Sequence, residues 1–249
     1  MAENVARTVD VVDTAPRFTA ADVAALNARF ESLDSCTMLE TVLAQGLAGR
    51  VAIISSFGAE SAVLLHLVAS IDAAVPVLFL DTGKHFPETL AYRDLLAARL
   101  GLADLRNLTP DAQLLAERDE SGQRWSYDPD GCCTIRKVAP LATAMAGVDA
   151  TITGRKGFQS ATRANLAYFE LDGSDAAGRL KINPLAYWSK ADLDAYVTAH
   201  DLPPHPLVAA GYPSIGCAPC TSQVQPGEDA RAGRWRGLDK VECGIHAPS

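Results

Sequence analysis

Hydrophobic residues along the chain alternate between short apolar runs and longer segments with helical periodicity. The short runs, bounded by turn residues, predict strands at residues 50–55, 75–80, 105–108 and 148–153. The amphipathic segments predict helices at residues 18–33, 37–47, 60–70, 87–100, 134–146 and 189–200. Pro87 in a first turn and Gly101 just past the end are typical helix boundaries. Alternating strands and helices predict an α/β fold with a parallel sheet covered by helices.

Two more segments, 166–171 and 179–182, flank the turn Asp172-Gly173-Ser174 and predict a hairpin-like excursion. The chain has 249 residues, of which 48% are hydrophobic and 21% charged, as in a globular protein. No apolar run approaches the roughly 18–20 residues of a membrane span. Residues 1–7 lack the apolar core of a signal peptide, so we expect a cytoplasmic protein with no membrane partner.

The net charge of −8, from 22 basic and 30 acidic residues, argues against binding to nucleic acid. Basic residues nevertheless cluster beside Cys- and Gly-containing motifs. Such clusters favour a small polyanionic substrate over a merely solvated face. The basic clusters are Arg136-Lys137, Arg155-Lys156, Arg163, and the group Arg231, Arg234 and Arg236.

The six cysteines, in a reducing compartment, indicate metal binding or catalysis rather than a disulfide framework. Four of them form two tight pairs, the adjacent Cys132-Cys133 and Cys217-x-x-Cys220. Structural zinc prefers Cys-x-x-Cys knuckles, and adjacent cysteines suit a knuckle poorly because their side chains diverge. An iron–sulfur cluster accepts neighbouring ligands at a helix N-terminus, so the spacing favours it over zinc. The helix predicted to follow Cys133 would also favour the thiolates.

Cys243 stands apart from these pairs, in the tail segment Glu242-Cys243-Gly244-Ile245-His246. Buried free cysteines usually lie in apolar runs, whereas this one follows a Gly- and Arg-rich stretch. A thiol on a terminal segment can react with a substrate and then reach a reducing partner. We therefore interpret Cys243 as a reactive thiol and Cys36 as a structural bystander.

A phosphate-type loop, Ser55-Ser56-Phe57-Gly58-Ala59-Glu60-Ser61, lies between a predicted strand and helix. Backbone N–H groups and the helix dipole at such a turn form an anion site. The loop lacks the Gly-Lys-Ser/Thr of a Walker A motif. It resembles the Ser-Gly-Gly-x-Asp-Ser loop of the ATP-pyrophosphatase superfamily, with Ser56-Phe57 replacing the first Gly and Glu60 at the acidic position. The bulkier loop predicts a smaller anion than a triphosphate.

Several segments together resemble the assimilatory adenylyl-sulfate (APS) reductases, the iron–sulfur-containing branch of the PAPS/APS reductase family. The resemblance extends from about Ser55 to His246. The segments that carry it are residues 80–86 (Leu-Asp-Thr-Gly-Lys-His-Phe), 131–141 (Gly-Cys-Cys-Thr-Ile-Arg-Lys-Val-Ala-Pro-Leu), 153–163 (Thr-Gly-Arg-Lys-Gly-Phe-Gln-Ser-Ala-Thr-Arg), 211–221 (Gly-Tyr-Pro-Ser-Ile-Gly-Cys-Ala-Pro-Cys-Thr), 231–235 (Arg-Ala-Gly-Arg-Trp) and 242–246.

The resemblance implies reduction of adenosine 5'-phosphosulfate (APS) to sulfite and AMP through an S-sulfocysteine on Cys243, with thioredoxin as reductant. It implies one [4Fe–4S] cluster held by Cys132, Cys133, Cys217 and Cys220. It places the activity in sulfate assimilation and cysteine biosynthesis. It also implies a set of substrate-binding residues: Ser55, Ser56, Gly58, Lys137, Arg155, Arg163, Arg231, Arg234 and His246. Residues 81–83 are expected at strand ends, on the side of the cleft opposite Ser55, Ser56 and Gly58. Trp235 is interpreted as a packing residue rather than a substrate contact.

The implied fold is a parallel-sheet, ATP-pyrophosphatase-like (adenine nucleotide alpha hydrolase-like) α/β domain with a mobile C-terminal tail. We divide the chain into an N-terminal helical segment packed on the core (residues 1–48), a nucleotide-binding domain with the iron–sulfur site (49–226) and a flexible tail carrying the catalytic Cys (227–249). The sequence leaves open whether the chain forms a homo-oligomer.

Three alternatives differ in chemistry. A PAPS reductase would act on the 3'-phosphorylated substrate, but such enzymes typically lack both cysteine pairs. An adenylating enzyme of the ATP-pyrophosphatase superfamily is disfavoured by the altered loop and by the thiol-bearing tail. A non-catalytic iron–sulfur or zinc module would leave Cys243 without a purpose.

Overall fold

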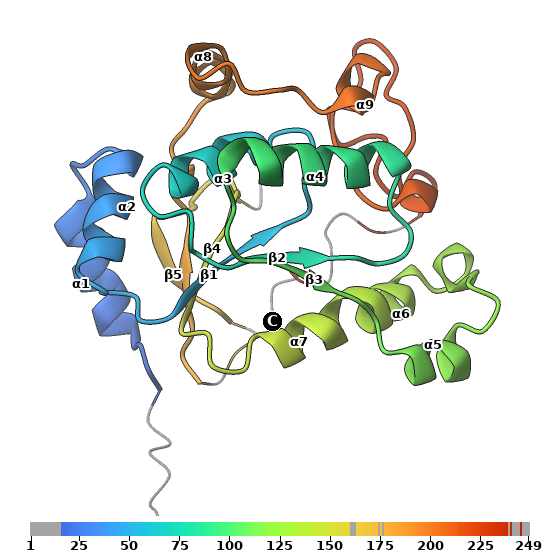
Figure 1. Cartoon of the computed structure of the whole chain (residues 1–249), viewed down its shortest axis with the longest axis horizontal. Helices are drawn as coiled ribbons and strands as arrows, with labels where there is room; N and C mark the ends of the chain where they lie inside the picture. The colour runs from blue at the N-terminus through green and yellow to red at the C-terminus, as the bar shows by residue number, and fades with distance from the viewer. Residues whose placement is uncertain are drawn as a thin grey trace, which may run out of the picture.

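In the part of the chain that the structure describes, six strands form a single sheet in the order β3-β2-β1-β4-β6-β5. The computed structural model describes residues 16–159, 163–173, 175, 177–238, 240 and 245 (Figure 1). Neighbouring strands run parallel, except that β5 pairs antiparallel with β6. The predicted α/β fold with a parallel sheet and one hairpin-like excursion is confirmed. The strands are β1 (Val51–Ser55), β2 (Val77–Leu80), β3 (Leu105–Leu108), β4 (Ala150–Ile152), β5 (Phe169–Leu171) and β6 (Leu180–Ile182).

The central strands are buried because helices cover both faces of the sheet. All four residues of β2 are buried, and three of the five in β1. A strand covered on both faces is a continuous apolar run rather than an alternating pattern, which is how the sequence encodes β1 and β2. Their apolar side chains form the main core together with α3 (Ser61–Ala69), which buries six of its nine residues.

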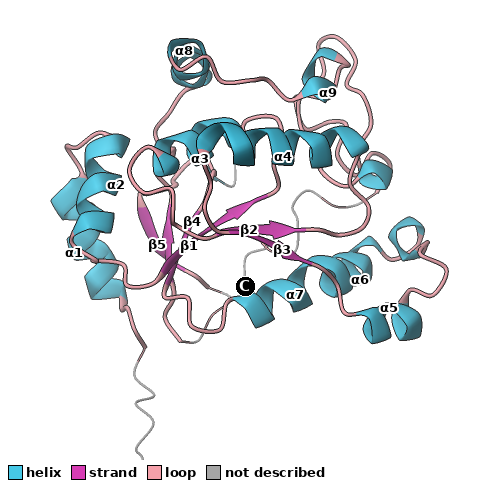
Figure 2. Cartoon of the chain, viewed as in Figure 1, coloured by secondary structure: helices cyan, strands magenta, loops and turns pink. Residues whose placement is uncertain are grey.

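The helices form two layers (Figures 1 and 2). On one face lie α3, α4 (Pro87–Leu100), α8 (Lys190–Ala199) and α9 (Pro206–Ala209). On the other lie α5 (Ala112–Arg118), α6 (Pro129–Cys133) and α7 (Ala139–Ala144), with α7 against β2 and β3. The ends of α4 match the prediction, because Pro87 occupies its first turn and Gly101 ends it at φ +63°.

The N-terminal helices α1 (Ala20–Phe30) and α2 (Ser35–Ala44) lie at the β5 edge of the sheet. Asn27 brackets Phe169 of β5, donating from Nδ2 to its carbonyl (2.9 Å) and accepting from its N–H at Oδ1 (3.0 Å). The Phe30 and Phe169 rings lie 5.6 Å apart. The Asn27 side chain of α1 therefore pairs with the backbone N–H and carbonyl of an edge-strand residue, groups that would otherwise have no partner strand.

The helix predicted at residues 134–146 begins earlier than expected, and that prediction is wrong at its start. Helix α6 begins at Pro129, after Asp128, whose side chain accepts from the Gly131 N–H at 2.8 Å. A π-helical turn, Thr134–Val138, then leads into α7. Cys132 and Cys133 therefore lie inside a continuous helical segment rather than ahead of a helix. The dipole argument from a following helix N-terminus no longer applies to them.

The order of the strands fixes where a ligand can enter. Strand β1 lies between β2 and β4, so the chain builds outward in one direction and then in the other from β1. In open α/β sheets the crevice at such a switch point, at the carboxyl ends of the strands, is the ligand site. The residues that directly follow β1 and β4 therefore lie at the edge of this crevice. In the described part of the chain, no helix is long and apolar enough to span a membrane.

Candidate active site

A cleft of about 240 Å³ opens at the carboxyl ends of β1, β2 and β4. Its walls come from seven separate parts of the sequence, which the fold brings together. Eight of the nine predicted substrate-binding residues line it: Ser55, Ser56, Gly58, Lys137, Arg155, Arg163, Arg231 and Arg234. The ninth, His246, and the predicted nucleophile Cys243 lie outside the described residues. Ile245, between them in the sequence, lines the cleft.

The loop between β1 and α3 forms the floor of the cleft. Phe57 has φ +48°, a left-handed conformation that costs a residue with a Cβ roughly 1–2 kcal/mol. Its ring is fully buried, edge-to-face with Phe79 at 5.5 Å, and its N–H donates to Ser55 Oγ at 3.2 Å. Burial of the Phe57 ring offsets this strain.

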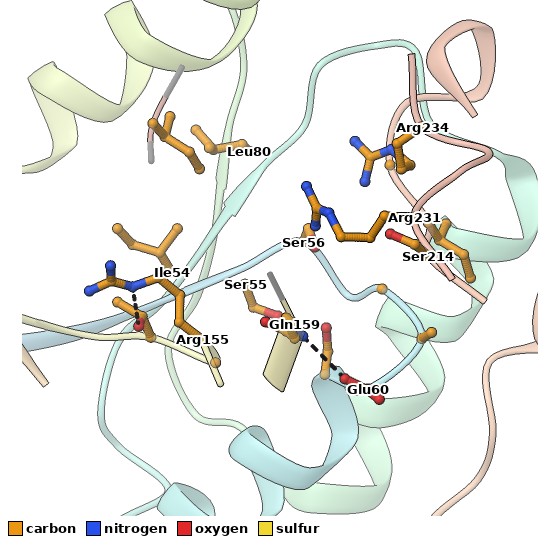
Figure 3. Close-up of a pocket in the computed structure, with 18 of the residues that line it drawn as sticks. Ile54, Ser55, Ser56, Glu60, Leu80, Arg155, Gln159, Ser214, Arg231 and Arg234 are labelled. Carbon is orange, nitrogen blue, oxygen red and sulfur yellow. Dashed lines mark hydrogen bonds between the residues drawn. The ribbon is translucent and has the colours of Figure 1, made fainter. Parts of the chain in front are cut away.

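Two arginines from the C-terminal part of the chain form one wall. Arg231 and Arg234 are linked by a turn in which the Arg234 N–H donates to the Arg231 carbonyl at 2.8 Å. Figure 3 shows both side chains on the same wall of the cleft. The Arg234 guanidinium lies 4.4 Å from the centroid of the Trp235 ring. The turn thus brings two cations, three residues apart in the sequence, to one wall of the cleft.

A buried ion pair ties the loop to the opposite wall. Lys156 is 2% exposed, and its Nζ lies 2.7 Å from the Glu60 carboxylate. Burial lowers the pKa of the Lys156 ammonium, while Glu60 acts in the opposite direction. Gln159 joins the pair by donating to Glu60 at 3.3 Å, as Figure 3 shows, and accepts from Arg163 at 2.6 Å. The network fixes Arg163 relative to the anion loop.

Arg155 lines the cleft but is held by protein partners. Its guanidinium forms an ion pair with Glu170 and donates to Asn183 Oδ1 at 3.0 Å. Asn183 is fully buried and also accepts from Thr153 Oγ1 at 2.6 Å. These contacts make Arg155 a structural anchor between β4 and the β5–β6 hairpin as well as a residue of the cleft wall.

The four paired cysteines line a second, small cavity next to the cleft. Cys132 and Cys133 come from α6, and Cys217 and Cys220 flank a 3₁₀ turn at Ala218–Cys220. The cleft and the cysteine cavity share three residues: Lys137, Cys217 and Trp235. Lys137 therefore lies between the thiols and the cleft.

The thiols sit in a partly buried, mixed-charge environment. Burial raises the pKa of the Cys132 and Cys220 thiols, and the nearby Cys217 adds to this effect, whereas Lys137 opposes it. Thr82 Oγ1 lies 3.4 Å from Cys217 Sγ. Across the residues that the structure describes, no three His, Cys, Asp or Glu side chains converge closely enough to hold a single metal ion.

Several predictions about individual residues need correction. Residues 81–83 do not line the cleft; Thr82 instead faces the cysteine cavity, through Cys217 and Arg136. Arg136 is buried against Asp119, with Nη2 to Oδ2 at 2.6 Å, and is part of the structure beneath the cysteines. Arg236 pairs with Glu228 at 2.8 Å rather than facing the cleft.

Polar residues that line the cleft but were not among the predicted substrate-binding residues include His85, Lys156, Gln159 and Ser214. All four fall within segments that carry the family resemblance, which was the available signal. Trp235, predicted as packing, is 3% exposed and also lines both cavities.

Comparison with known proteins places the chain in a family. Residues 50–223 match the phosphoadenosine phosphosulfate reductase domain. The adenosine 5'-phosphosulfate reductase of Mesorhizobium japonicum is 49% identical over 96% of this chain and 93% of that protein. The protein of the same name from Chelativorans sp. is 54% identical over 80% of each chain.

Solved structures agree with this assignment. The phosphate complex of phosphoadenylyl-sulfate (PAPS) reductase from Candida auris has a TM-score of 0.67 and 26% identity, covering 84% of this chain and all of that one. Candida glabrata FMN adenylyltransferase shares the fold alone, with a TM-score of 0.55 and 14% identity over 89% of this chain and 85% of that one. With the cleft, the loop and these matches together, the chain belongs to the phosphoadenosine phosphosulfate reductase family.

Proposed function

We propose that this protein is a thioredoxin-dependent APS reductase that converts adenosine 5'-phosphosulfate to sulfite and AMP. The observation that carries the proposal is the composition of the cleft, where an anion loop faces basic side chains from three distant segments. An anionic phosphosulfate suits such a site, and two relatives at 49% and 54% identity bear the name APS reductase. The activity would serve sulfate assimilation and cysteine biosynthesis in the cytoplasm.

The substrate would bind with its nucleotide phosphate at the β1–α3 loop. Ser55, Ser56 and Gly58 supply hydroxyl and backbone donors there. Arg231 and Arg234 would neutralise the sulfate oxygens, because guanidinium groups bind oxyanions with two parallel hydrogen bonds. Lys137, Arg163 and Arg155 would complete the field of positive charge around the phosphosulfate.

The chemistry would proceed by two thiol displacements. The Cys243 thiolate attacks the sulfur of APS, an S–S bond forms as the S–O bond to AMP breaks, and AMP leaves with the electron pair. The S-sulfocysteine product is then attacked at the Cys243 sulfur by a thioredoxin thiolate, which releases sulfite and leaves a mixed disulfide. The second thioredoxin thiol resolves that disulfide and restores the Cys243 thiolate. One dithiol is oxidised, two protons are released and the sulfur gains two electrons.

The remaining paired cysteines suit a resident iron–sulfur cluster. Cys132, Cys133, Cys217 and Cys220 line one cavity, and four thiolates are the ligand set of a [4Fe–4S] cluster. Cys132, Cys133, Cys217 and Cys220 would hold such a cluster, and a cluster would not require the four sulfurs to converge on a single ion. When bound, the cluster would offset the charge of the four thiolates, three of which belong to buried cysteines, and would cross-link the two segments. Thiol exchange already supplies both electrons of the reaction.

Metal analysis tests the cluster. Anaerobically purified protein should be brown and contain iron and acid-labile sulfide, and replacing any one of the four cysteines by Ser should bleach it. Cys36→Ser is the matched control, because Cys36 is exposed on α2 and should leave the cluster intact. Zinc without iron or sulfide would contradict the proposal.

PAPS reduction is the second candidate, favoured by the name of the matched domain and by the Candida auris structure. A sulfite-release assay with reduced thioredoxin, run on APS and PAPS side by side, separates the two. We expect APS to be the better substrate, with Cys243→Ser inactive and Cys36→Ser active. Turnover of PAPS alone would replace the proposal with its alternative, and no sulfite from either substrate would refute both.

A further inference from the structure

A single carboxylate lies among the cations of the cleft. Of the described residues that line the cleft, Glu60 is the one with an acidic side chain. It directly precedes α3 and follows Gly58 of the anion loop by two residues. An uncompensated negative charge there would repel the anion that the loop is suited to bind. The lysines and arginines that share the cleft with it are Lys137, Arg155, Lys156, Arg163, Arg231 and Arg234.

Lys156 supplies a counter-charge to Glu60 from the opposite wall. Its Nζ lies 2.7 Å from Glu60 Oε2. The Lys156 side chain is 3% exposed and that of Glu60 is 27% exposed, so the ammonium is enclosed while the carboxylate reaches the surface of the cleft. Lysine is almost never fully buried unless its charge is paired. Because so little of its side chain is exposed, Lys156 is suited to pair with Glu60 rather than to bind a ligand directly.

The Glu60 side chain is turned towards this wall and not towards its own helix. An acidic residue that precedes a helix commonly accepts hydrogen bonds from the N–H groups of the first turn. The Glu60 side chain makes no such capping bond to α3. It accepts instead from Lys156 Nζ at 2.7 Å and from Gln159 Nε2 at 3.3 Å, the second of which Figure 3 shows.

The same contacts position an arginine of the cleft. Gln159 donates to Glu60 through Nε2, and its Oε1 accepts from Arg163 Nη1 at 2.6 Å and from the Lys156 N–H at 3.3 Å. Gln159 therefore connects the ion pair to the Arg163 guanidinium. The charge of Glu60 and the place of Arg163 are controlled by one network.

We propose that Lys156 is a positioning residue that neutralises Glu60 and so keeps the cleft attractive to an anionic nucleotide. Lys156 touches no reacting atom. It acts through Glu60 and, by way of Gln159, on Arg163. This inference rests on the proposed function, in which the phosphate of APS lies at the loop that precedes Glu60.

The test uses Lys156→Met, which keeps an apolar stem and leaves the Glu60 carboxylate without its counter-charge. Calorimetry on the full-length, anaerobically purified protein gives the Kd of AMP, and the Kd of APS is measured with Cys243→Ser also present so that APS is not consumed. We expect both nucleotides to bind about 10–30-fold more weakly, because like charges repel in a partly solvated cleft. The kcat at saturating APS should stay within about threefold of wild type, since the effect is on binding.

Removing both charges separates a counter-ion from a ligand-binding lysine. Glu60→Gln with Lys156→Met should bind AMP within about threefold of Glu60→Gln alone, because no carboxylate is left to repel the nucleotide. A lysine that contacted the nucleotide would leave the double variant as weak as Lys156→Met. The ratio of the Kd of Lys156→Met to that of wild type should also shrink as salt rises from about 0.05 to 0.5 M, because salt screens the repulsion.

Two more variants guard against general damage. Lys156→Arg keeps the charge and should bind AMP within about threefold of wild type, which keeps the proposal testable if Lys156→Met does not fold. Lys181→Met is the matched control, because Lys181 of β6 pairs with Asp172 at 2.8 Å, is 17% exposed, and is not among the described residues that line the cleft. Equal AMP affinities for Lys156→Met and Lys181→Met, a double variant as weak as Lys156→Met, or an Lys156→Arg protein that folds but binds AMP more than tenfold more weakly would overturn the proposal.

Binding and turnover fail separately. If wild type binds AMP but releases no sulfite from APS, the proposed function fails, and the Kd of AMP alone then decides on Lys156. Unchanged AMP affinity in Lys156→Met would refute the counter-ion whether or not the protein reduces APS. A wild type that binds neither nucleotide would overturn both.

Discussion

Gly216 provides the space in which Arg234 reaches the cleft. A Cβ built on Gly216 would lie 2.5 Å from Arg234 Cζ and 3.0 Å from its Nη1. Carbon atoms in contact normally lie about 3.5–4.0 Å apart, so Gly216→Ala should push the guanidinium away by roughly 1–1.5 Å. The backbone at Gly216 is not in the left-handed region, so alanine adds no conformational strain there.

The displacement should cost activity without removing the charge. A charge-assisted hydrogen bond contributes about 1.5–3 kcal/mol, and a misplacement of about 1 Å can cost up to about a hundredfold in rate. We therefore expect Gly216→Ala to lower kcat/KM for APS by about 10–100-fold. Arg234→Ala, which removes the guanidinium altogether, should cost at least as much.

A double-mutant cycle tests whether the loss of activity in Gly216→Ala arises through Arg234. If Gly216 matters because it accommodates Arg234, then Gly216→Ala should cost little when Arg234 is already Ala. The assay is sulfite release from APS with saturating reduced thioredoxin, with circular dichroism to establish that each variant is folded. Two results would refute the reasoning: a Gly216→Ala enzyme within twofold of wild type, or an equal loss from Gly216→Ala on both backgrounds.

Three further predictions concern the nucleophile, the loop and the pH dependence of stability. Cys243→Ser should abolish turnover while AMP binding, measured by calorimetry, stays near wild type; retained turnover would exclude Cys243. Phe57→Ala should lower the free energy of unfolding by about 3–5 kcal/mol in urea, and Phe57→Gly by less, because Gly adopts φ +48° without strain; the reverse order would contradict the strain argument. Burial lowers the pKa of His205 to about 4, and its Nδ1 accepts from the Leu207 N–H at 3.1 Å. Because the unfolded chain binds this proton more tightly, stability should fall as pH drops from about 6.5 towards 4, by up to about 3 kcal/mol. His205→Asn should flatten this part of the urea-derived profile, and an unchanged slope would exclude His205 as its origin.

The sequence predicted the sheet and the longer helices well, because their signals are local. Helix α4 carries its own boundaries in Pro87 and Gly101, and the apolar runs of β1 and β2 reflect burial on both faces. Helix α6 was missed because Gly131 interrupts the helical pattern, although Asp128-Pro129 is a recognisable cap and first turn.

The roles of the basic residues could not be read from the sequence with the same success. Arg136 and Arg155 belong to motifs rich in substrate-binding residues, yet the structure pairs them with Asp119 and Glu170. Those partners lie 17 and 15 positions away and are brought into contact only by the fold. The sequence could show that the cations cluster, whereas only the fold shows which of them are also paired with carboxylates.

The central claim is that a single thiol, that of Cys243, receives the sulfonate group of APS. Incubating the protein with APS and no reductant, followed by peptide mass spectrometry, tests it directly. We predict one sulfonate adduct on the Cys243 peptide, which reduced thioredoxin discharges as an equal amount of sulfite. An adduct on Cys133 or Cys220 instead, or sulfite release with Cys243 unmodified throughout, would contradict the account.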